Sequence, residues 1–242
     1  MRVAILTDIH ANLPALEAVL AAIKEADVEE RWCLGDVVGY GAQPDQCTRL
    51  VRDRCELCLV GNHDLAVTGD ISTEVFSASA AAAVEWTRSN SEPETVDFLR
   101  KLSPKATDRE VGLYHASPRD PVWEYVLALD QALECMEQQS APVSLIGHSH
   151  VALYFSDGGN GGEGGQAPAD HTLELSEGRW LINPGSVGQP RDGDPRAAWL
   201  ELDTEARTAT YRRVDYEIDR AAEAIREAGL PEMLADRLYI GQ

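Results

Sequence analysis

The sequence predicts a mixed α/β fold (α+β mixed) with two mixed β-sheets flanked by helices, and three observations carry this prediction. Apolar strand patterns alternate with helical patterns through the first two-thirds of the 242 residues, as in a largely parallel sheet with helices packed outside it. The last third changes to strands joined by turns, which predicts a second, more antiparallel sheet. Because we find no internal repeat and no convincing linker, we expect a single domain over residues 1–242.

The elements of the first two-thirds are assigned from periodicity, propensity and capping residues. Leu13, Leu16 and Leu20 recur at helical spacing after the first strand, and Asn12 is placed to cap that helix. An alanine-rich stretch predicts a later helix by propensity alone. In chain order we expect strands at 1–6, 31–34, 56–60, 111–114 and 143–146, and helices from 13 onward and at 44–54, 77–87 and 91–102.

Turns rather than helices connect the strands of the last third. We expect strands at 151–156, 172–175, 180–182, 197–202 and 208–214, and closing helices at 219–228 and 231–238. Between the first two of these strands, residues 158–165 hold six glycines among eight residues. Glycine loses the most backbone entropy on folding and offers no side chain to pack, so we expect a mobile hairpin tip there.

The charge balance excludes several classes of partner. There are 41 Asp and Glu against 21 Lys and Arg, a formal net charge of −20. A polyanion would be repelled at long range, so we expect neither nucleic acid nor an anionic membrane as a partner. No apolar run approaches the roughly 20 residues of a membrane-spanning helix, and the N-terminal strand lacks the features of a signal peptide. We therefore expect a cytoplasmic location; the oligomeric state is left open.

The five cysteines fit reduced thiols better than a disulfide framework, because they are odd in number and lie in or beside apolar segments. Cys55 and Cys58 have the CxxC spacing, but no second CxxC accompanies them. A zinc knuckle or redox pair is thus the weaker reading, and small buried hydrophobic side chains the stronger one.

Polar clusters follow five of the expected strands directly, and they contain five of the six histidines. Ligands bind at the carboxyl ends of the strands in an α/β sheet, so we expect these side chains to converge on one edge. Asp8 and His10 stand two apart, as do His148 and His150, and in extended chain this spacing points both side chains the same way. His171 lies outside the clusters and is expected at the surface. The clusters are D-x-H at 8–10, G-D at 35–36, G-N-H-D at 61–64, His115 and G-H-x-H at 147–150.

Carboxylate, imidazole and amide ligands together suit divalent transition metals better than calcium, which prefers oxygen alone. The absence of cysteine from the clusters counts against a structural zinc site. Each cluster alone also fits an ordinary turn or cap, since Gly, Asn and Asp dominate such positions. A metal site is favoured because all five clusters occur together and each lies at the end of an expected strand.

These five motifs, in this order, resemble the full signature of the calcineurin-like metallophosphoesterases. The shape of the rest of the chain resembles the small bacterial branch of that superfamily, as does N-P-G-S-V-G at 183–188 after a strand. The resemblance implies a four-layer α-β-β-α sandwich, in agreement with the two sheets expected above. It further implies two divalent transition-metal ions (Mn, Fe, Zn, Ni or Co) bridged by one carboxylate.

The resemblance also implies a role for each motif residue. Asp36 would bridge the two metals, and His63 would face the leaving group while Asp64 orients its ring. Two ions ~3.5–4 Å apart can clamp a phosphoryl group and lower the pKa of a bridging water enough to supply hydroxide. The first metal would be held by Asp8, His10 and His150, and the second by Asn62, His115 and His148.

One departure narrows the expected substrates. The protein phosphatases of the superfamily carry G-D-x-V-D-R-G, whose arginine binds phosphate, whereas residues 35–41 here read G-D-V-V-G-Y-G. Tyr40 stands where that arginine would be, which disfavours a protein phosphatase and favours small phosphodiesters or phosphomonoesters. Arg119 and Arg191 follow motif-bearing strands and could replace it, although surface turns are an equally good reading for both.

The leading hypothesis is a dinuclear metal-dependent phosphoesterase acting by attack of a metal-bound hydroxide on a small phosphoester. A diadenosine tetraphosphatase-like or protein phosphatase-like hydrolase is the alternative within the enzyme class. A non-catalytic scaffold of the same fold would be expected to lose ligands, and none of the seven metal-ligand candidates is missing. A nuclease is disfavoured by the net charge and the absence of a basic stripe.

Overall fold

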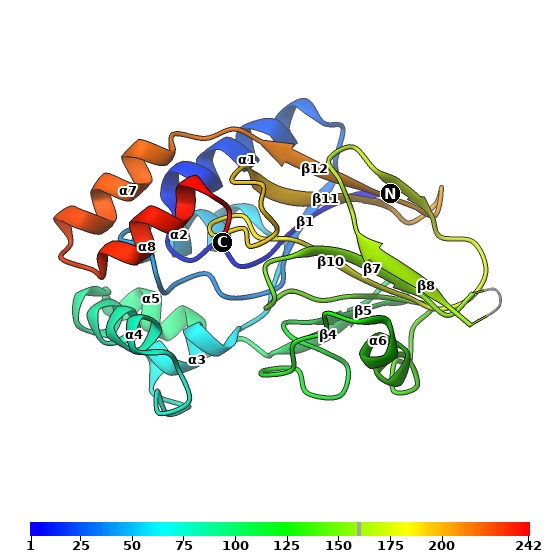
Figure 1. The fold of residues 1–242 in the computed structure, drawn as a ribbon, viewed down its shortest axis with the longest axis horizontal. Helices are drawn as coiled ribbons and strands as arrows, with labels where there is room; N and C mark the ends of the chain where they lie inside the picture. Colours follow the sequence, from blue (N-terminus) through cyan, green and yellow to red (C-terminus); the bar gives the residue numbers. More distant parts are fainter. Residues whose placement is uncertain (159–160) are drawn as a thin grey trace.

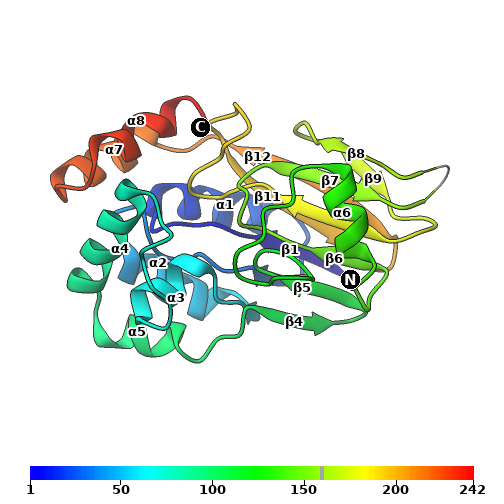
Figure 2. The ribbon, with the colours of Figure 1, turned by 60° about the horizontal axis from the view of Figure 1, so that its bottom comes forward.

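The described residues of the computed structural model, 1–158 and 161–242, form two six-stranded sheets with helices on their outer faces (Figures 1 and 2). Both sheets mix parallel and antiparallel pairs, as expected. The first sheet has the order β3 (Leu57–Cys58), β2 (Glu30–Cys33), β1 (Arg2–Leu6), β11 (Ala197–Asp203), β12 (Thr208–Val214), β9 (Thr172–Glu174). The second has the order β4 (Lys105–Asp108), β5 (Val111–Tyr114), β6 (Val143–Leu145), β10 (Trp180–Pro184), β7 (Ala152–Ser156), β8 (Glu163–Gln166).

The helices gather mainly at one end of the molecule. In both views α3, α4 and α5 lie together there, with α7 and α8 beside them, while α6 lies at the other end (Figures 1 and 2). No helix of the described residues is long and apolar enough to cross a membrane. The helices are α1 (Leu13–Glu25), α2 (Pro44–Arg54), α3 (Asn62–Thr68), α4 (Ala78–Asn90), α5 (Pro93–Leu99), α6 (Leu129–Met136), α7 (Ile218–Glu227) and α8 (Glu232–Asp236), followed by the 3-10 turn η1 (Arg237–Tyr239).

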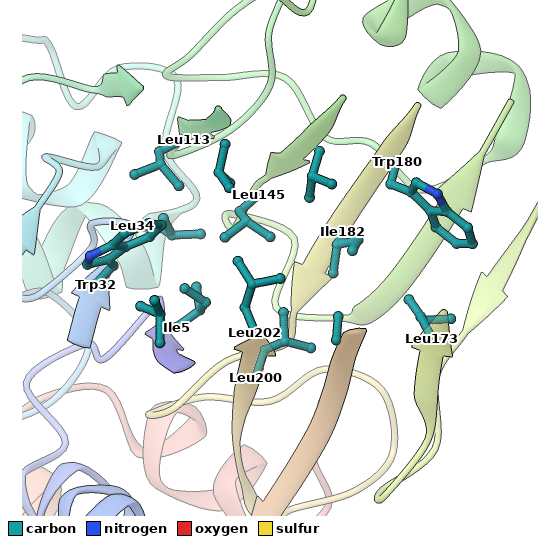
Figure 3. Close-up of a cluster of buried hydrophobic side chains, with 14 of the residues drawn as sticks. Ile5, Trp32, Leu34, Leu113, Leu145, Leu173, Trp180, Ile182, Leu200 and Leu202 are labelled. Atoms are coloured by element: carbon teal, nitrogen blue, oxygen red, sulfur yellow. The ribbon is translucent and has the colours of Figure 1, made fainter. Parts of the chain in front are cut away.

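The core lies between the two sheets, as Figure 3 shows. Side chains alternate along β1, so Val3 and Ile5 face the other sheet while Ala4 and Leu6 face the helices. Trp32 of β2 is fully buried in the layer between the sheets. Burying a large apolar side chain of this kind typically contributes about 1.5–3 kcal/mol, so this layer holds the strand ends in fixed positions.

Local capping explains several helix boundaries. The Asn12 side chain accepts from Ala15 N and starts α1, and Ser77 does the same for Ala80 N at α4. Pro93 stands in the first turn of α5, where its missing N–H costs nothing. The sequence predicted the capped start of α1 correctly and placed the starts of α4 and α5 within two residues of those observed.

The last third does not form a sheet of its own, so that expectation is wrong. β11 pairs antiparallel with β1, whereas β10 pairs parallel with β6. A turn joins β11 to β12 as an antiparallel hairpin, and β7 and β8 also pair antiparallel. Local sequence predicts such hairpins, but long-range pairing decides which sheet receives each of them.

Two smaller expectations also need correction. Glu163–Gln166 form β8 and pair with β7, so this part of the glycine-rich segment is strand rather than a loose tip. Residues 159–160 lie outside the described residues. His171 is half-buried, with its ring 5.6 Å from that of Tyr154 and 6.5 Å from that of Tyr211 between centroids.

Candidate metal centre

The candidate ligands meet where the strands end. Asp8 follows β1, Asp36 follows β2, His115 follows β5 and His148 follows β6. Among the described residues, potential ligand atoms fall within 4.8 Å of one another in two groups that share Asp36. All of these residues are buried. One group holds Asp8, His10, Asp36 and His150, and the other holds Asp36, His115 and His148.

The backbone that brings these side chains together is strained, not extended as expected from the spacing. Asp8 and His10 have φ of 53° and 50°, Asp36 has 51°, and His148 and His150 have 64° and 61°. Such left-handed conformations cost non-glycine residues on the order of 1–3 kcal/mol each and persist where the surroundings enforce them. Here the backbone N–H of Asp8 donates to Gly35 O and that of His10 to Asp36 O. The left-handed turns that follow the strands therefore orient the ligand side chains; the alternation of side chains along an extended strand does not.

In the first group, the imidazoles of His10 and His150 point at each other. Their Nε2 atoms are 3.0 Å apart. Each ring is held from its other side, because Nδ1 of His10 lies 3.1 Å from Val38 O and Nδ1 of His150 lies 2.7 Å from Gln189 O. A carbonyl oxygen only accepts, so Nδ1 carries the proton in both rings and Nε2 presents a lone pair.

The second group is built the same way. Nδ1 of His115 lies 3.0 Å from Leu34 O, and its Nε2 lies 3.1 Å from Oδ1 of Asn62. His148 is turned around, because its Nε2 lies 3.2 Å from Trp123 O and leaves Nδ1 as the free nitrogen. Asn62 opens α3, so the helix start fixes its amide beside His115.

Asp36 lies between the two groups. Its Oδ2 is 3.6 Å from Nε2 of His10 and 3.6 Å from Nε2 of His115. Its other oxygen, Oδ1, accepts from His63 N at 2.9 Å. A Cβ on Gly61 would come within 2.0 Å of Oδ1, so only glycine leaves room for the Asp36 carboxylate. Any side chain at position 61 would collide with the Asp36 carboxylate, which explains the glycine of the G-N-H-D motif.

Two carboxylate oxygens of the centre are buried with no hydrogen-bond partner among the described residues, namely Asp8 Oδ1 and Asp36 Oδ2. The opposite oxygen of Asp8, Oδ2, accepts from Thr7 Oγ1 at 2.9 Å and from His148 N at 3.0 Å. Buried carboxylate oxygens are normally paired, since an unpaired one loses its hydration without compensation. Both unpaired oxygens face the imidazole Nε2 atoms.

Burial sets the charge state of the centre in the absence of a cation. It raises the pKa of Asp8 to about 7 and that of Asp36 well above its ordinary value. It lowers the pKa of His10, His115 and His150 well below the ordinary value, so these rings stay neutral. A bound cation would stabilise the ionised form of these carboxyls and could be coordinated by the neutral imidazoles. This combination of groups therefore favours a cation site.

The donors fit divalent transition metals. Oriented imidazole lone pairs and unpaired carboxylate oxygens are the ligands that Mn, Fe, Co, Ni and Zn accept. Asp8, His10 and His150 would hold one ion, and Asn62, His115 and His148 a second, with the Asp36 carboxylate within reach of both. Bound cations would neutralise the carboxylates and relieve the facing lone pairs.

His63 and Asp64 do not form the pair that we expected. The Asp64 carboxylate accepts from Val38 N and Gly61 N, both at 3.0 Å, so it braces the loops that carry the ligands. Nδ1 of His63 is buried and has no hydrogen-bond partner among the described residues. It packs against Gly39, where a Cβ would lie 2.5 Å from it. An orienting role of Asp64 toward the His63 ring is therefore wrong.

A cavity of about 470 Å³ opens beside the centre. Ligand candidates Asn62 and His148 reach it, and so does His63. Several of the lining side chains are aromatic, and α8 and η1 add Met233 and Arg237, which no motif in the sequence signalled. The lining residues are Tyr40, Asn62, His63, Val75, Phe76, Ser77, Ser79, Ala80, Trp123, Tyr125, His148, Arg191, Met233 and Arg237.

Of the two arginines that could replace the phosphate-binding arginine, only one lines the cavity. Arg191 lines the cavity, and its Cζ lies 5.6 Å from the centroid of the Tyr40 ring. Arg119 instead forms ion pairs with Glu124 and Glu134 outside the cavity lining. Tyr40 therefore occupies the sequence position of the expected arginine, and its ring contacts Arg191, which comes from a later part of the chain.

Neither CxxC cysteine belongs to a ligand group: Cys55 caps the end of α2 and Cys58 lies in β3. Cys58 is the register partner of Cys33 in the parallel pair of β2 and β3. A hydrogen bond with Cys33 raises the pKa of Cys58, and burial raises the pKa of Cys55. Such thiols are poor nucleophiles and poor metal ligands, in keeping with their reading as small apolar side chains.

Comparison with known proteins adds to this geometry. Residues 1–205 match the family model described as the calcineurin-like phosphoesterase superfamily domain. An uncharacterized protein of Methanocaldococcus jannaschii is 37% identical over 255 residues, covering 99% of this chain and 98% of that protein. A metallophosphoesterase crystal structure from Sphaerobacter thermophilus is 39% identical, with a TM-score of 0.90 and coverage of 100% of this chain and 99% of that one.

A more distant structure shares the fold. A hypothetical protein from Pyrococcus horikoshii OT3 is 20% identical and superimposes with a TM-score of 0.81, covering 100% of this chain and 98% of that one. The two-sheet architecture therefore persists at low sequence identity.

Proposed function

The chain belongs to the calcineurin-like phosphoesterase superfamily, and we propose that it hydrolyses phosphoester bonds of small molecules with two divalent metal ions bound at this centre. The observation that carries the proposal is the position of Asp36 between two ligand groups. One buried carboxylate oxygen lies 3.6 Å from an imidazole nitrogen of each group, which supports a pair of ions sharing that carboxylate. The adjoining cavity holds an arginine suited to phosphate.

Bound divalent ions would clamp the phosphoryl group and lower the pKa of a bound water so that it can attack at phosphorus. The protein's own residues do the rest. Arg191 is placed to donate two N–H groups to the non-bridging phosphate oxygens, in the fork geometry that favours phosphate. Its stacking on Tyr40 holds the guanidinium toward the cavity.

His63 is placed to give a proton to the leaving oxygen. It lines the cavity beside Arg191, and its backbone N–H is fixed by Asp36. Burial lowers the pKa of His63 well below its ordinary value. The negative charge of a bound phosphate would oppose that effect and favour the protonated ring during leaving-group departure.

The cavity supports small esters rather than a phosphorylated protein. Its volume of about 470 Å³ lies within the range of small-molecule sites. The paired rings of Phe76 and Trp123, 5.4 Å apart in the lining, would keep a folded protein surface away from the metal centre.

The direct test is hydrolysis by metal-depleted protein after separate additions of Mn²⁺, Fe²⁺, Co²⁺, Ni²⁺ and Zn²⁺. The substrates are 4-nitrophenyl phosphate, a monoester, and bis(4-nitrophenyl) phosphate, a diester. We expect turnover of at least one ester that appears with metal and disappears with chelator. Asp36→Asn serves as the matched inactive variant. If the metal-loaded protein binds ions but cleaves neither ester, the scaffold alternative is correct and the proposal is overturned.

A further inference from the structure

The C-terminal segment completes the wall of the cavity. Residues 206–242 lie beyond the part of the chain that matches the family model, which ends at 205. In both views α7 and α8 lie beside α4 (Figures 1 and 2). Leu234 and Leu238 are buried in one hydrophobic cluster with Ala80 and Ala83 of α4 and with Tyr40. This packing fixes η1, so that Arg237 reaches the cavity.

Arg191 and Arg237 are two cations without acidic side-chain partners. Within the described residues, neither is within 4.0 Å of an Asp or Glu carboxylate, and the cavity lining includes no acid. Nε of Arg191 is buried and unpaired there, while its Nη2 donates to Gln189 Oε1 at 2.8 Å. Nε of Arg237 donates to the backbone oxygen of Gln242. By contrast, Arg226 of α7 pairs with two acids.

This arrangement is notable because acids outnumber bases 41 to 21 along the chain. Two neighbouring guanidinium groups repel each other, and removal from water adds to the cost. Burial and the charge of Arg191 lower the pKa of Arg237. An anion in the cavity would relieve both effects, since a guanidinium binds phosphate or carboxylate with paired N–H donors.

The two arginines are held by different parts of the chain. The backbone N–H of Arg191 donates to the backbone oxygen of His150 at 3.0 Å, so Arg191 lies directly beside a metal-ligand candidate. Arg237 belongs to η1, and its Nε donates to Gln242 near the end of the described chain. Arg191 is therefore placed to bind the phosphate at the metals, and Arg237 to bind another group of the substrate at the C-terminal wall of the cavity.

We propose that Arg237 binds a second anionic group of the substrate, so that the preferred substrates are small phosphoesters that also carry a phosphate or a carboxylate. This inference rests on the proposed function and defines the substrate class of the same cavity. Arg237 acts as a specificity-determining residue: it touches the distant anion and takes no part in the chemistry. The reaction would release inorganic phosphate or a phosphomonoester and leave the second anionic group intact.

The test compares three competitors of 4-nitrophenyl phosphate hydrolysis that share a three-carbon skeleton. These are glycerol 3-phosphate, 3-phosphoglycerate and 2,3-bisphosphoglycerate, with metal ion kept in excess of all ligands. We expect the wild-type inhibition constants of the two-anion compounds to be at least about tenfold lower than that of glycerol 3-phosphate, as one charge-assisted hydrogen-bond pair provides. The carboxylate and bisphosphate compounds show which second anion is preferred.

Substitutions of Arg237 test whether this residue causes the preference for two-anion compounds. Arg237→Gln should reduce the preference for two-anion compounds about tenfold, and Arg237→Lys should restore part of it. Arg52→Gln, which makes the same charge change at an exposed arginine outside the cavity lining, should keep the full preference. The ratio of inhibition constants within each variant is independent of the fraction of folded, metal-loaded protein.

The outcomes separate the two proposals. If wild-type protein with metal hydrolyses no nitrophenyl ester, the proposed function itself fails. If it hydrolyses the ester but binds all three competitors equally, or if Arg237→Gln and Arg237→Lys keep the wild-type preference, then Arg237 holds no substrate anion and this inference is overturned while the proposed function stands.

Discussion

The Nε2 atoms of His10 and His150 lie 3.0 Å apart, although neither carries a proton. Both rings place their Nδ1–H against a backbone carbonyl, so two lone pairs face each other in a buried site. Lone pairs at this distance repel unless a cation lies within reach of both. Burial lowers the pKa of both rings, which argues against a proton in that place and favours a metal ion.

Metal binding should release protons at mildly acidic pH. The pKa of Asp8 is raised to about 7 and that of Asp36 is also raised, so the metal-free protein holds protons on these carboxyls below about pH 7. A metal ion displaces those protons, and its apparent affinity should therefore rise with pH between about 6 and 8. The histidines, whose pKa values are lowered, are already neutral and release none.

Calorimetric titration in two buffers of different ionisation enthalpy measures the proton count. We expect at least about one proton per protein at pH 6 and fewer at pH 8.5. A count near zero at pH 6, or an affinity that falls as pH rises, would show that the carboxyls are already ionised and that burial does not set their charge.

Asp36→Asn should weaken both metal sites, because its Oδ2 is shared by the two ligand groups. The substitution keeps the shape and the Oδ1 contact to His63 N but removes the charge. His115→Ala should weaken one site and leave the other, since His115 belongs to one group only. Metal stoichiometry after equilibrium dialysis distinguishes the variants, and equal retention of two ions by Asp36→Asn would place the bridging ligand elsewhere.

Arg191→Gln should lower kcat/KM for nitrophenyl esters by about 10–100-fold with metal content unchanged, because hydrogen bonds to a charged group contribute about 1.5–3 kcal/mol. Arg119→Gln is the matched control, since Arg119 is engaged with Glu124 and Glu134. It should stay within about threefold of wild type. Similar losses in both variants would indicate a general charge effect rather than phosphate binding by Arg191.

His63→Asn should affect esters according to their leaving groups. A nitrophenolate departs with little help, whereas an alkoxide needs a proton, and general acid assistance is worth about 10²–10⁴-fold. The variant should retain its metals and much of its nitrophenyl ester activity, yet lose most activity on alkyl phosphoesters such as glycerol 3-phosphate. The ratio of the two rates cancels differences in folding. Equal losses on both substrates would reduce His63 to electrostatic support, and loss of metal would make it a ligand.

Much of the fold was predictable because its signals are local. Strand runs, the Asn12 cap, the alanine-rich helix α4 and the closing helices appear where periodicity, capping chemistry and helix propensity indicate them. Sheet membership was not predictable, since β10 and β11 follow each other in sequence but join different sheets through contacts with β6 and β1. Nothing in a short apolar run specifies its partner strand, whether that strand is fairly near in sequence, as β6 is to β10, or distant, as β1 is to β11.

Some features of the metal centre were likewise predictable from the sequence and others were not. Motif order indicated the residues that the structure brings together, but the geometry assumed for Asp8 and His10 was wrong, because left-handed backbone rather than extended chain aims them. Asp64 braces backbone N–H groups instead of the His63 ring. Arg237 could not be foreseen, since its place in the cavity depends on packing of the C-terminal helices against α4.

Stepwise addition of Mn²⁺ to metal-free protein, with bis(4-nitrophenyl) phosphate and 4-nitrophenyl phosphate turnover recorded at each addition, tests the central claim most directly. If Asp36 joins two ions into one catalytic centre, activity on the better ester should stay low at one equivalent, where single occupancy dominates, and reach its plateau near two. Full activity at one equivalent, or two bound equivalents with no hydrolysis of either ester, would contradict a dinuclear phosphoesterase.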